Sequence, residues 1–428
     1  MTDSSASPQQ TAAGRDLCRA TAIRRITARI IEAPTTRQHK LSNTSVRHQG
    51  YIFVSVELDN GVTGFGEGST LGGPRWAEES VEAMKANIDA YLAPALIGQP
   101  ACLAEAASLR MELAAKRNYT AKSAIDMALL DALGKTLEVP AHVLLGGAVR
   151  TSFEAIWALA SGDAAQEVEE ALEMIRRGWF RRFKIKLGFA DPQTDLARLA
   201  ALQKALPAGT PLVADVNQAW SEAECIRHLP ALRDLGVSLI EQPIAAGQTA
   251  ASARIATRSE VPVMMDESVS TLAEAARESA AATGSVLSLK LCKHGSAHNL
   301  KRVAGIAAAQ GVQLYGGCLL ESSIGAAGHL QAFATLPRLD WGTEQFGPKI
   351  LVEDLVTEAW ILGGPVLCDC PPRRALPGYL SFLWIPFGGS PPRRDRRRDR
   401  QPHRSVAPRV LRGGPDRKST RLNSSHAR

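Results

Sequence analysis

Four charged residues recur at almost equal spacing in the second half of the chain. Asp215, Glu241, Asp266 and Lys290 each follow a short apolar run, and the gaps between them are 26, 25 and 24 residues. One βα unit of a (β/α)8 barrel takes about that many residues, and the carboxyl ends of its parallel strands meet at one rim. The spacing therefore predicts four charged groups at the same height on four neighbouring strands.

The apolar runs alternate with helical patterns from about residue 155 onward. One unit before Asp215, the run RFKIK ends in Lys184 and Lys186, and a last short segment lies near 340–346. Strand and helix alternating at this period indicate parallel strands, and we predict a closed (β/α)8-type barrel. The alternative is an open doubly wound sheet, but no G-x-G-x-x-G motif follows the first strand of either region.

The first third of the chain has strand patterns first and helical patterns afterwards. The expected strands are 17–33, ended by Pro34, then 50–58 and the run VTGFGEG after the turn signal Asn60-Gly61; the expected helices are 76–92, 101–115 and 119–137. Strands and helices in separate runs predict an α+β domain. The predicted fold class is therefore α/β, a modified TIM barrel with an N-terminal α+β domain.

The composition changes near residue 359, where periodicity disappears and Arg and Pro accumulate. We interpret this tail as sequence translated after a loss of reading frame, and a disordered basic tail is the alternative. The predicted segments are a disordered N-terminus at 1–16, the α+β domain at 17–150, the barrel at 151–358 and the aberrant or disordered tail at 359–428.

Charge and hydropathy exclude two classes of partner. A formal charge of +7 would favour nucleic acid, but residues 391–428 contain 13 Lys or Arg against 3 Asp or Glu, so the remainder is mildly acidic. No run approaches the roughly 18 apolar residues that span a bilayer. We expect neither a nucleic-acid nor a membrane partner. Seven scattered cysteines show no disulfide framework, so a cytoplasmic location is expected.

Three carboxylates at one barrel rim predict a site for a hard divalent cation, which prefers oxygen ligands. For a single strand-end carboxylate the ordinary alternative is capping of the next helix. Three carboxylates in phase with lysines favour the cation site formed by Asp215, Glu241 and Asp266. Asn217 and Glu267 flank these residues and are expected to support them.

The lysines are placed for acid–base chemistry. Lys186 and Lys290 end strands on opposite sides of the carboxylates, so each is expected to face one side of a bound substrate. Lys184 lies on the same strand face as Lys186, and together with a cation it should lower the pKa of its neighbour. A cation and such lysines suit proton transfer at the carbon next to a carboxylate.

These residues belong to a series of motifs that resembles one family. K-I-K, D-V-N, E-Q-P, M-D-E-S, S-L-K-L-C-K-H-G, L-L-E-S-S-I-G and W-G-T-E-Q-F-G-P occur in this order. With QHKLSNTS and GEGSTLGGP, they resemble the muconate lactonizing branch of the enolase superfamily over about residues 22–357. The resemblance implies a capping domain over the barrel, Mn²⁺ or Mg²⁺ as cofactor, and a homo-oligomer, an octamer by resemblance.

The resemblance also implies an activity and a role for each matching residue. The activity is muconate cycloisomerase, the reversible lactonisation of cis,cis-muconate, a small dicarboxylate, in catechol breakdown by the β-ketoadipate pathway. Asp215, Glu241 and Asp266 match the metal ligands, and Lys186 matches the lysine that protonates the enolate carbon. The other matches are Lys184 as its electrostatic partner, Lys290 on the opposite face, and Glu344 and Glu321 as acidic residues at the rim.

Two capping loops are expected to close over the barrel and to contact the substrate. The substrate residues expected in them are His39 and Lys40 in 35–48, and Thr70 and Gly72 in 68–74.

Other activities remain open at this point. Chloromuconate cycloisomerase, o-succinylbenzoate synthase and dipeptide epimerase share the barrel motifs, and an inactive product with a scrambled C-terminus is a further alternative. Cys318 and Ser322 depart from the Thr and Gly expected there. Ser322 is expected to narrow the rim.

Overall fold

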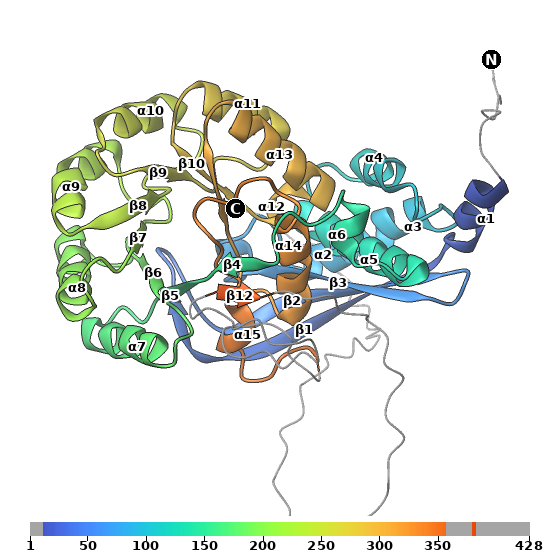
Figure 1. The fold of residues 1–428 in the computed structure, drawn as a ribbon, viewed down its shortest axis with the longest axis horizontal. Helices are drawn as coiled ribbons and strands as arrows, with labels where there is room; N and C mark the ends of the chain where they lie inside the picture. Colours follow the sequence, from blue (N-terminus) through green and yellow to red (C-terminus); the bar gives the residue numbers. More distant parts are fainter. Residues whose placement is uncertain (1–11, 357–378, 382–428) are drawn as a thin grey trace, which may run out of the picture.

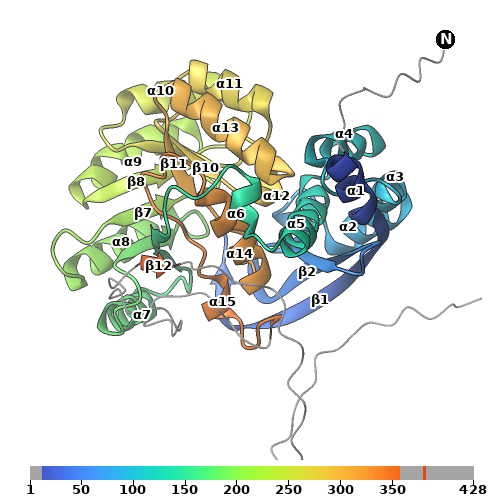
Figure 2. The same ribbon diagram turned by 45° about the vertical axis from the view of Figure 1, so that its right-hand side comes forward.

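The computed structural model describes residues 12–356 and 379–381. An antiparallel sheet covered by helices lies beside a parallel barrel whose helices form its outer layer (Figure 1). The fold class is as predicted from the sequence, with an α+β capping domain and a barrel of parallel strands. Helix α5 (Tyr119–Leu137) packs against the antiparallel sheet on one side and contacts the barrel on the other (Figure 2).

In the part of the chain that the structure describes, the capping domain contains three antiparallel strands in the order β1-β2-β3. Their bounds are β1 Ile23–Lys40, β2 Ser45–Leu58 and β3 Thr63–Thr70. The predicted hairpin turn is present, because Leu58 N donates to Val62 O at 2.9 Å and Gly61 adopts a φ of 84°. The remaining short elements and helices are η1 Gly73–Arg75, α2 Val81–Asn87, η2 Ile88–Leu92, α3 Ala93–Leu96, α4 Ala104–Ala114 and α6 Ala141–Leu144.

Glycines on β3 permit close approach of α5. A Cβ atom on Gly64 would lie 2.1 Å from Ala128 O, and one on Gly66 would lie 2.0 Å from Ala124 O. Either contact is far inside van der Waals distance, so the sequence GFGEG fits a strand pressed against a helix backbone.

The N-terminus differs from the prediction. Ala12–Ala20 forms helix α1, where we expected a disordered segment followed by a strand. The run AAGRDLCRA contains good helix formers, and Thr21 Oγ1 donates to Leu17 O at 2.8 Å as the helix ends. Strand β1 begins only at Ile23.

Strand β1 also continues past Pro34, which was expected to end it. The proline lacks an N–H donor, but the register shifts between Pro34 and His39, and Pro34 O accepts from Val352 N at 2.9 Å. Segment 35–48 is therefore the far end of the β1–β2 hairpin rather than a loop, with Lys40 paired to Ser45.

Within the described residues, the barrel contains seven parallel strands in chain order, from β5 to β11. Their bounds are β5 Ile156–Leu159, β6 Arg182–Lys186, β7 Leu212–Asp215, β8 Val237–Glu241, β9 Val263–Met265, β10 Val286–Leu289 and β11 Gln313–Gly316. The helices are α7 Ala164–Arg176, α8 Pro192–Ala205, α9 Glu222–Asp234, α10 Thr249–Arg258, α11 Leu272–Ala280, α12 Leu291–His294, α13 Ala297–Ala309, α14 Ser323–Phe333 and α15 Gly347–Ile350.

The predicted eighth segment closes the barrel. Thr343 forms parallel bridges to both Ala155 and Gly316, beside the first and last strands. Inside, six strands contribute one buried residue each to a small apolar cluster that forms the floor below the rim: Ile156, Val213, Leu239, Met264, Val286 and Tyr315.

Two short strands outside the barrel form an antiparallel pair. Strand β4 (Ser152–Glu154) pairs with β12 (Tyr379–Ser381). Apart from β12, the segment interpreted as a loss of reading frame lies outside the described residues. None of the described helices is long and apolar enough to cross a bilayer.

Candidate active site

The register of the parallel strands places the predicted rim residues side by side. Lys186 pairs with Asp215 across β6 and β7, and Asp215 pairs with Glu241 across β7 and β8. Asp266 and Lys290 directly follow β9 and β10, the next two strands of the barrel. The charged groups therefore meet at one rim, as their spacing predicts.

Asp215 binds both lysines of the K-I-K motif. Its Oδ2 lies 2.9 Å from Lys184 Nζ and 2.6 Å from Lys186 Nζ. Lys186 Nζ also donates to Asn217 Oδ1 at 3.1 Å. Burial alone would raise the pKa of Asp215, but the two ammonium groups outweigh it and lower this pKa.

Lys184 is held by three carboxylates. Besides Asp215, its Nζ lies 2.7 Å from Glu241 Oε2 and 3.1 Å from Glu344 Oε2. Burial would lower the pKa of Lys184, but these carboxylates raise it well above its usual value. Lys184 therefore stays an ammonium group at neutral pH.

The charged form of Glu241 is incompletely compensated by its surroundings. Burial and the nearby Asp215 carboxylate raise its pKa well above the usual range, although Lys184 acts in the opposite direction. Its Oε1 atom is buried and has no hydrogen-bond partner among the described residues. A buried carboxylate oxygen without a donor favours a bound cation at this position.

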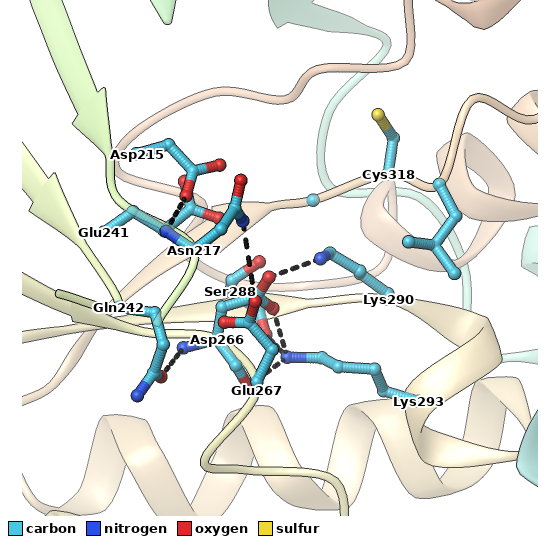
Figure 3. A network of polar contacts seen from close by, with 12 residues as sticks. Asp215, Asn217, Glu241, Gln242, Asp266, Glu267, Ser288, Lys290, Lys293 and Cys318 are labelled. Atoms are coloured by element: carbon cyan, nitrogen blue, oxygen red, sulfur yellow. Dashed lines mark hydrogen bonds and ion pairs between the residues drawn. The ribbon is translucent and has the colours of Figure 1, made fainter. Parts of the chain in front are cut away.

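Asp266 lies between two lysines (Figure 3). Its Oδ2 is 2.5 Å from Lys290 Nζ, and its Oδ1 is 2.6 Å from Lys293 Nζ. Burial alone would raise the pKa of Asp266, but both ammonium groups hold it well below its usual value. Likewise, burial would lower the pKa of Lys290, and Asp266 and Glu241 instead raise it well above the usual range.

Lys293 is a site residue that strand-end spacing did not identify. It lies on the one-turn helix α12, three residues after Lys290, so it falls outside any count of strand ends. The second lysine of S-L-K-L-C-K-H-G was the signal that would have found it.

Unusual backbone turns follow two of the rim strands. Asn217 and Gln242 have φ values of 47° and 32°, in a region that non-glycine residues rarely adopt. Gln242 Oε1 accepts from Asp266 N at 2.9 Å, which joins the ends of β8 and β9. Asn217 Nδ2 donates to Glu267 Oε1 at 3.5 Å, and burial together with Asp266 raises the pKa of Glu267 to about 7.

A cavity of about 230 Å³ opens at this rim and extends to the capping domain. Its polar wall includes the lysines Lys186, Lys290 and Lys293 and four acidic residues of the rim: Glu241, Asp266, Glu267 and Glu344. The capping domain and the barrel loops contribute apolar groups to the same wall: Leu71, Trp76, Leu319 and Phe346.

The predicted substrate residues of the capping domain are not equally close to this cavity. His39 is buried in its wall, and burial with the charge of Arg37 lowers its pKa well below the usual value, so it is a neutral imidazole. Lys40 does not line the cavity and lies instead over the ring of Phe189. In the second predicted loop, Leu71 lines the cavity, whereas Thr70 and Gly72 do not.

The two rim glutamates have different positions. Glu344 lines the cavity and accepts from Cys318 N at 3.2 Å as well as contacting Lys184. Glu321 is buried behind the cavity wall, where both its oxygens accept from Leu319 N at 2.9 Å.

Ser322 does not narrow the cavity as expected. Its N–H donates to Glu67 Oε1 at 2.9 Å, and its hydroxyl donates to Glu67 Oε2. Cys318 does line the cavity. Ser322 instead connects α14 to strand β3 of the capping domain, a role that a single rim motif does not reveal.

The donor chemistry of the rim fits a hard divalent cation. Asp215, Glu241 and Asp266 are buried carboxylates, and the orphaned Glu241 Oε1 shows that the surrounding lysines do not satisfy all of their oxygens. In the part of the chain that the structure describes, no three carboxylate, imidazole or thiol groups form a ready-made metal cluster. The lysines contact the carboxylates in this arrangement.

Comparison with known proteins identifies the class. Residues 25–146 match the N-terminal domain of mandelate racemase / muconate lactonizing enzyme, and residues 166–364 match the enolase C-terminal domain-like family. A capping domain over a barrel rim of carboxylates and lysines thus defines an enzyme of the enolase superfamily. The chain belongs to the mandelate racemase/muconate lactonizing enzyme family, and membership implies a divalent metal.

Several relatives cover most of the chain. Muconate cycloisomerase 1 from Pseudomonas putida is 44% identical over 338 residues, which are 78% of this chain and 90% of that protein. Chloromuconate cycloisomerase from Cupriavidus pinatubonensis is 41% identical over 333 residues, with the same coverage. The crystal structure of muconate lactonizing enzyme from Pseudomonas fluorescens complexed with muconolactone has a TM-score of 0.80 at 39% identity, covering 85% of this chain and 94% of that one.

Proposed function

We propose that this protein is a cycloisomerase that interconverts cis,cis-muconate and muconolactone. The observation that carries the proposal is the pair of cavity-lining lysines, Lys186 and Lys290, on opposite sides of three strands that end in carboxylates. A planar substrate between them would meet one ammonium group on each face.

Counting donors separates these two lysines from Lys184. An ammonium group has three N–H donors. Among the described residues, Lys184 contacts three carboxylates, whereas Lys186 has two acceptors and Lys290 has one. Lys186 and Lys290 therefore keep donors for a ligand in the cavity, and Lys184 contributes fixed positive charge.

The proposed reaction uses these groups in turn. One carboxylate of cis,cis-muconate attacks the conjugated double bond, and the other carboxylate takes up negative charge as an enolate. Lys186 donates a proton to the enolate carbon, and in the reverse direction the neutral amine removes it. Lys184 sustains the positive potential at that face, and Lys290 stabilises charge from the other.

Asp215, Glu241 and Asp266 would hold the cation, for which we infer Mn²⁺ or Mg²⁺. When bound, the cation supplies positive charge to the carboxylate that becomes the enolate. Removing it with a chelator should abolish turnover, and adding Mn²⁺ back should restore it.

A lysine variant tests the proposal directly. We expect Lys186→Met to reduce lactonisation by about 10²–10⁴-fold, the usual contribution of a general acid, while calorimetry still detects Mn²⁺ binding. Lys349→Met is the matched control, because Lys349 lies over the ring of Trp179 outside the cavity. Activity of Lys186→Met within tenfold of the parent would contradict the assigned role.

Chloromuconate is the second candidate substrate, because a chloromuconate cycloisomerase is 41% identical over nearly the same length. The 44% identity to muconate cycloisomerase 1 favours the unchlorinated dicarboxylate. Measuring kcat/KM with cis,cis-muconate and with 2- and 3-chloromuconate decides between them, and we expect the highest value with cis,cis-muconate.

A further inference from the structure

The two carboxylate oxygens of Asp266 are held in different ways (Figure 3). Lys290 Nζ contacts Oδ2 at 2.5 Å, and this is the single polar contact that the Lys290 ammonium group makes among the described residues. Lys293 Nζ contacts Oδ1 at 2.6 Å and is tied to the backbone as well.

Lys293 uses all of its donors on fixed acceptors. Besides Asp266 Oδ1, its Nζ donates to the carbonyl oxygens of Asp266 and Ser288, each at 2.8 Å. Three N–H donors and three acceptors leave none for a ligand. Although Lys293 lines the cavity, its ammonium group is therefore part of the wall.

Lys293 links the ends of strands β9 and β10 to helix α12. Ser288 lies in β10, Asp266 directly follows β9, and Lys293 lies on α12, so one ammonium group ties two strand ends to a helix. Helix α12 is fixed in turn, because Leu291 N donates to His329 Nε2 at 3.0 Å.

We infer that Lys293 is a positioning residue that fixes Oδ1 of Asp266 and thereby presents Oδ2 to the catalytic cation. The Lys290 ammonium group has a single contact, so it can leave Oδ2 to the cation and use its donors for the substrate. The inference rests on the metal-dependent function proposed above and assigns one oxygen of Asp266 to each task.

Mn²⁺ affinity distinguishes a positioning role of Lys293 from the effect of its positive charge alone. Removing a positive charge near a cation should strengthen cation binding, so charge alone predicts tighter Mn²⁺ binding for both Lys290→Met and Lys293→Met. We expect tighter or unchanged binding only for Lys290→Met. For Lys293→Met we expect Mn²⁺ affinity to fall by about 10–100-fold, as for other residues that orient a metal ligand.

The measurement is calorimetric titration of the purified full chain with Mn²⁺, without substrate. Lys301→Met is the matched control, because its Nζ donates to Leu145 O far from the rim, and its Mn²⁺ affinity should equal that of the parent. If Lys293→Met does not fold, Lys293→Leu, which likewise removes all three donors, is held to the same criterion.

A Mn²⁺ affinity of Lys293→Met equal to or above that of the parent overturns the inference. The proposed function is tested separately, by turnover of cis,cis-muconate by the parent. A parent that binds Mn²⁺ and lacks turnover contradicts the function, whereas an unaffected Lys293→Met variant contradicts only the positioning role.

Discussion

At the scale of single residues, one buried carboxyl group joins the capping domain to the barrel. Glu67 on β3 accepts from Ser322 N at 2.9 Å and from Gly325 N at 3.3 Å at the start of α14. Burial raises the pKa of Glu67 to about 8, with a smaller contribution from the charge of Glu321. This contact is therefore made by a protonated carboxyl group at neutral pH.

The raised pKa of Glu67 predicts how stability depends on pH. The folded state holds the proton more tightly than the unfolded chain, so the stabilisation is present below about pH 4.5 and is lost as pH rises toward 8. Glu67→Gln imitates the protonated form, so we expect it to lose less stability than the parent between pH 5 and pH 8. The difference should be a few kcal/mol, since one pKa unit is about 1.4 kcal/mol. Urea unfolding at both pH values measures it, and parallel pH profiles would refute the buried-proton explanation.

At the scale of elements, the sequence predicted the features that recur in every βα unit. It missed the contacts between segments that lie far apart in the chain. The rim appeared from spacing because each βα unit advances the chain by one strand, and parallel strands end together. Lys293 escaped because it lies on the short helix α12 after its strand. Segment 35–48 was interpreted as a loop because its polar residues and Pro34 carry no strand pattern, and the acceptors that hold it lie in the barrel.

Helices α7 and α8 are joined by a buried ionic network that no local pattern indicates. Arg198 donates to Glu167 Oε1 at 2.7 Å and to Asp195 Oδ1 at 2.8 Å, and it also reaches Lys186 O at 3.2 Å. All three charged side chains are at most 4% exposed. The network therefore supports the end of β6, which carries the proposed proton donor.

We expect Arg198→Met to destabilise the protein by about 3–5 kcal/mol, because two buried carboxylates lose their partner. Arg254→Met is the control, since Arg254 pairs with Glu222 at the surface, and exposed pairs are worth about 0–1 kcal/mol. Chemical denaturation compares the two variants. If both variants lose the same free energy of unfolding, burial of the network does not add to its stabilising effect.

At the scale of the whole molecule, the β1–β2 hairpin reaches from the capping domain to the barrel. Arg37 donates from Nη2 to Ala158 O at 2.6 Å and from Nε to Glu170 Oε1 at 2.7 Å. Lys40 N donates to Ala160 O at 2.8 Å. These contacts place His39, between Arg37 and Lys40, in the cavity wall. The cavity therefore depends on docking of the two domains as well as on the barrel rim.

Loss of this docking should weaken binding of the substrate and leave binding of the cation unchanged. Arg37→Met removes hydrogen bonds from a charged donor, each worth about 1.5–3 kcal/mol, so we expect kcat/KM for cis,cis-muconate to fall by about 10–100-fold, mainly through KM. Mn²⁺ affinity should stay unchanged, because Asp215, Glu241 and Asp266 all belong to the barrel. Arg47→Met is the matched control, since Arg47 is exposed on the same hairpin and contacts only Gln38 through its side chain among the described residues. Steady-state kinetics and Mn²⁺ titration of both variants provide the comparison. A loss of Mn²⁺ affinity in Arg37→Met would mean that the capping domain shapes the metal site itself.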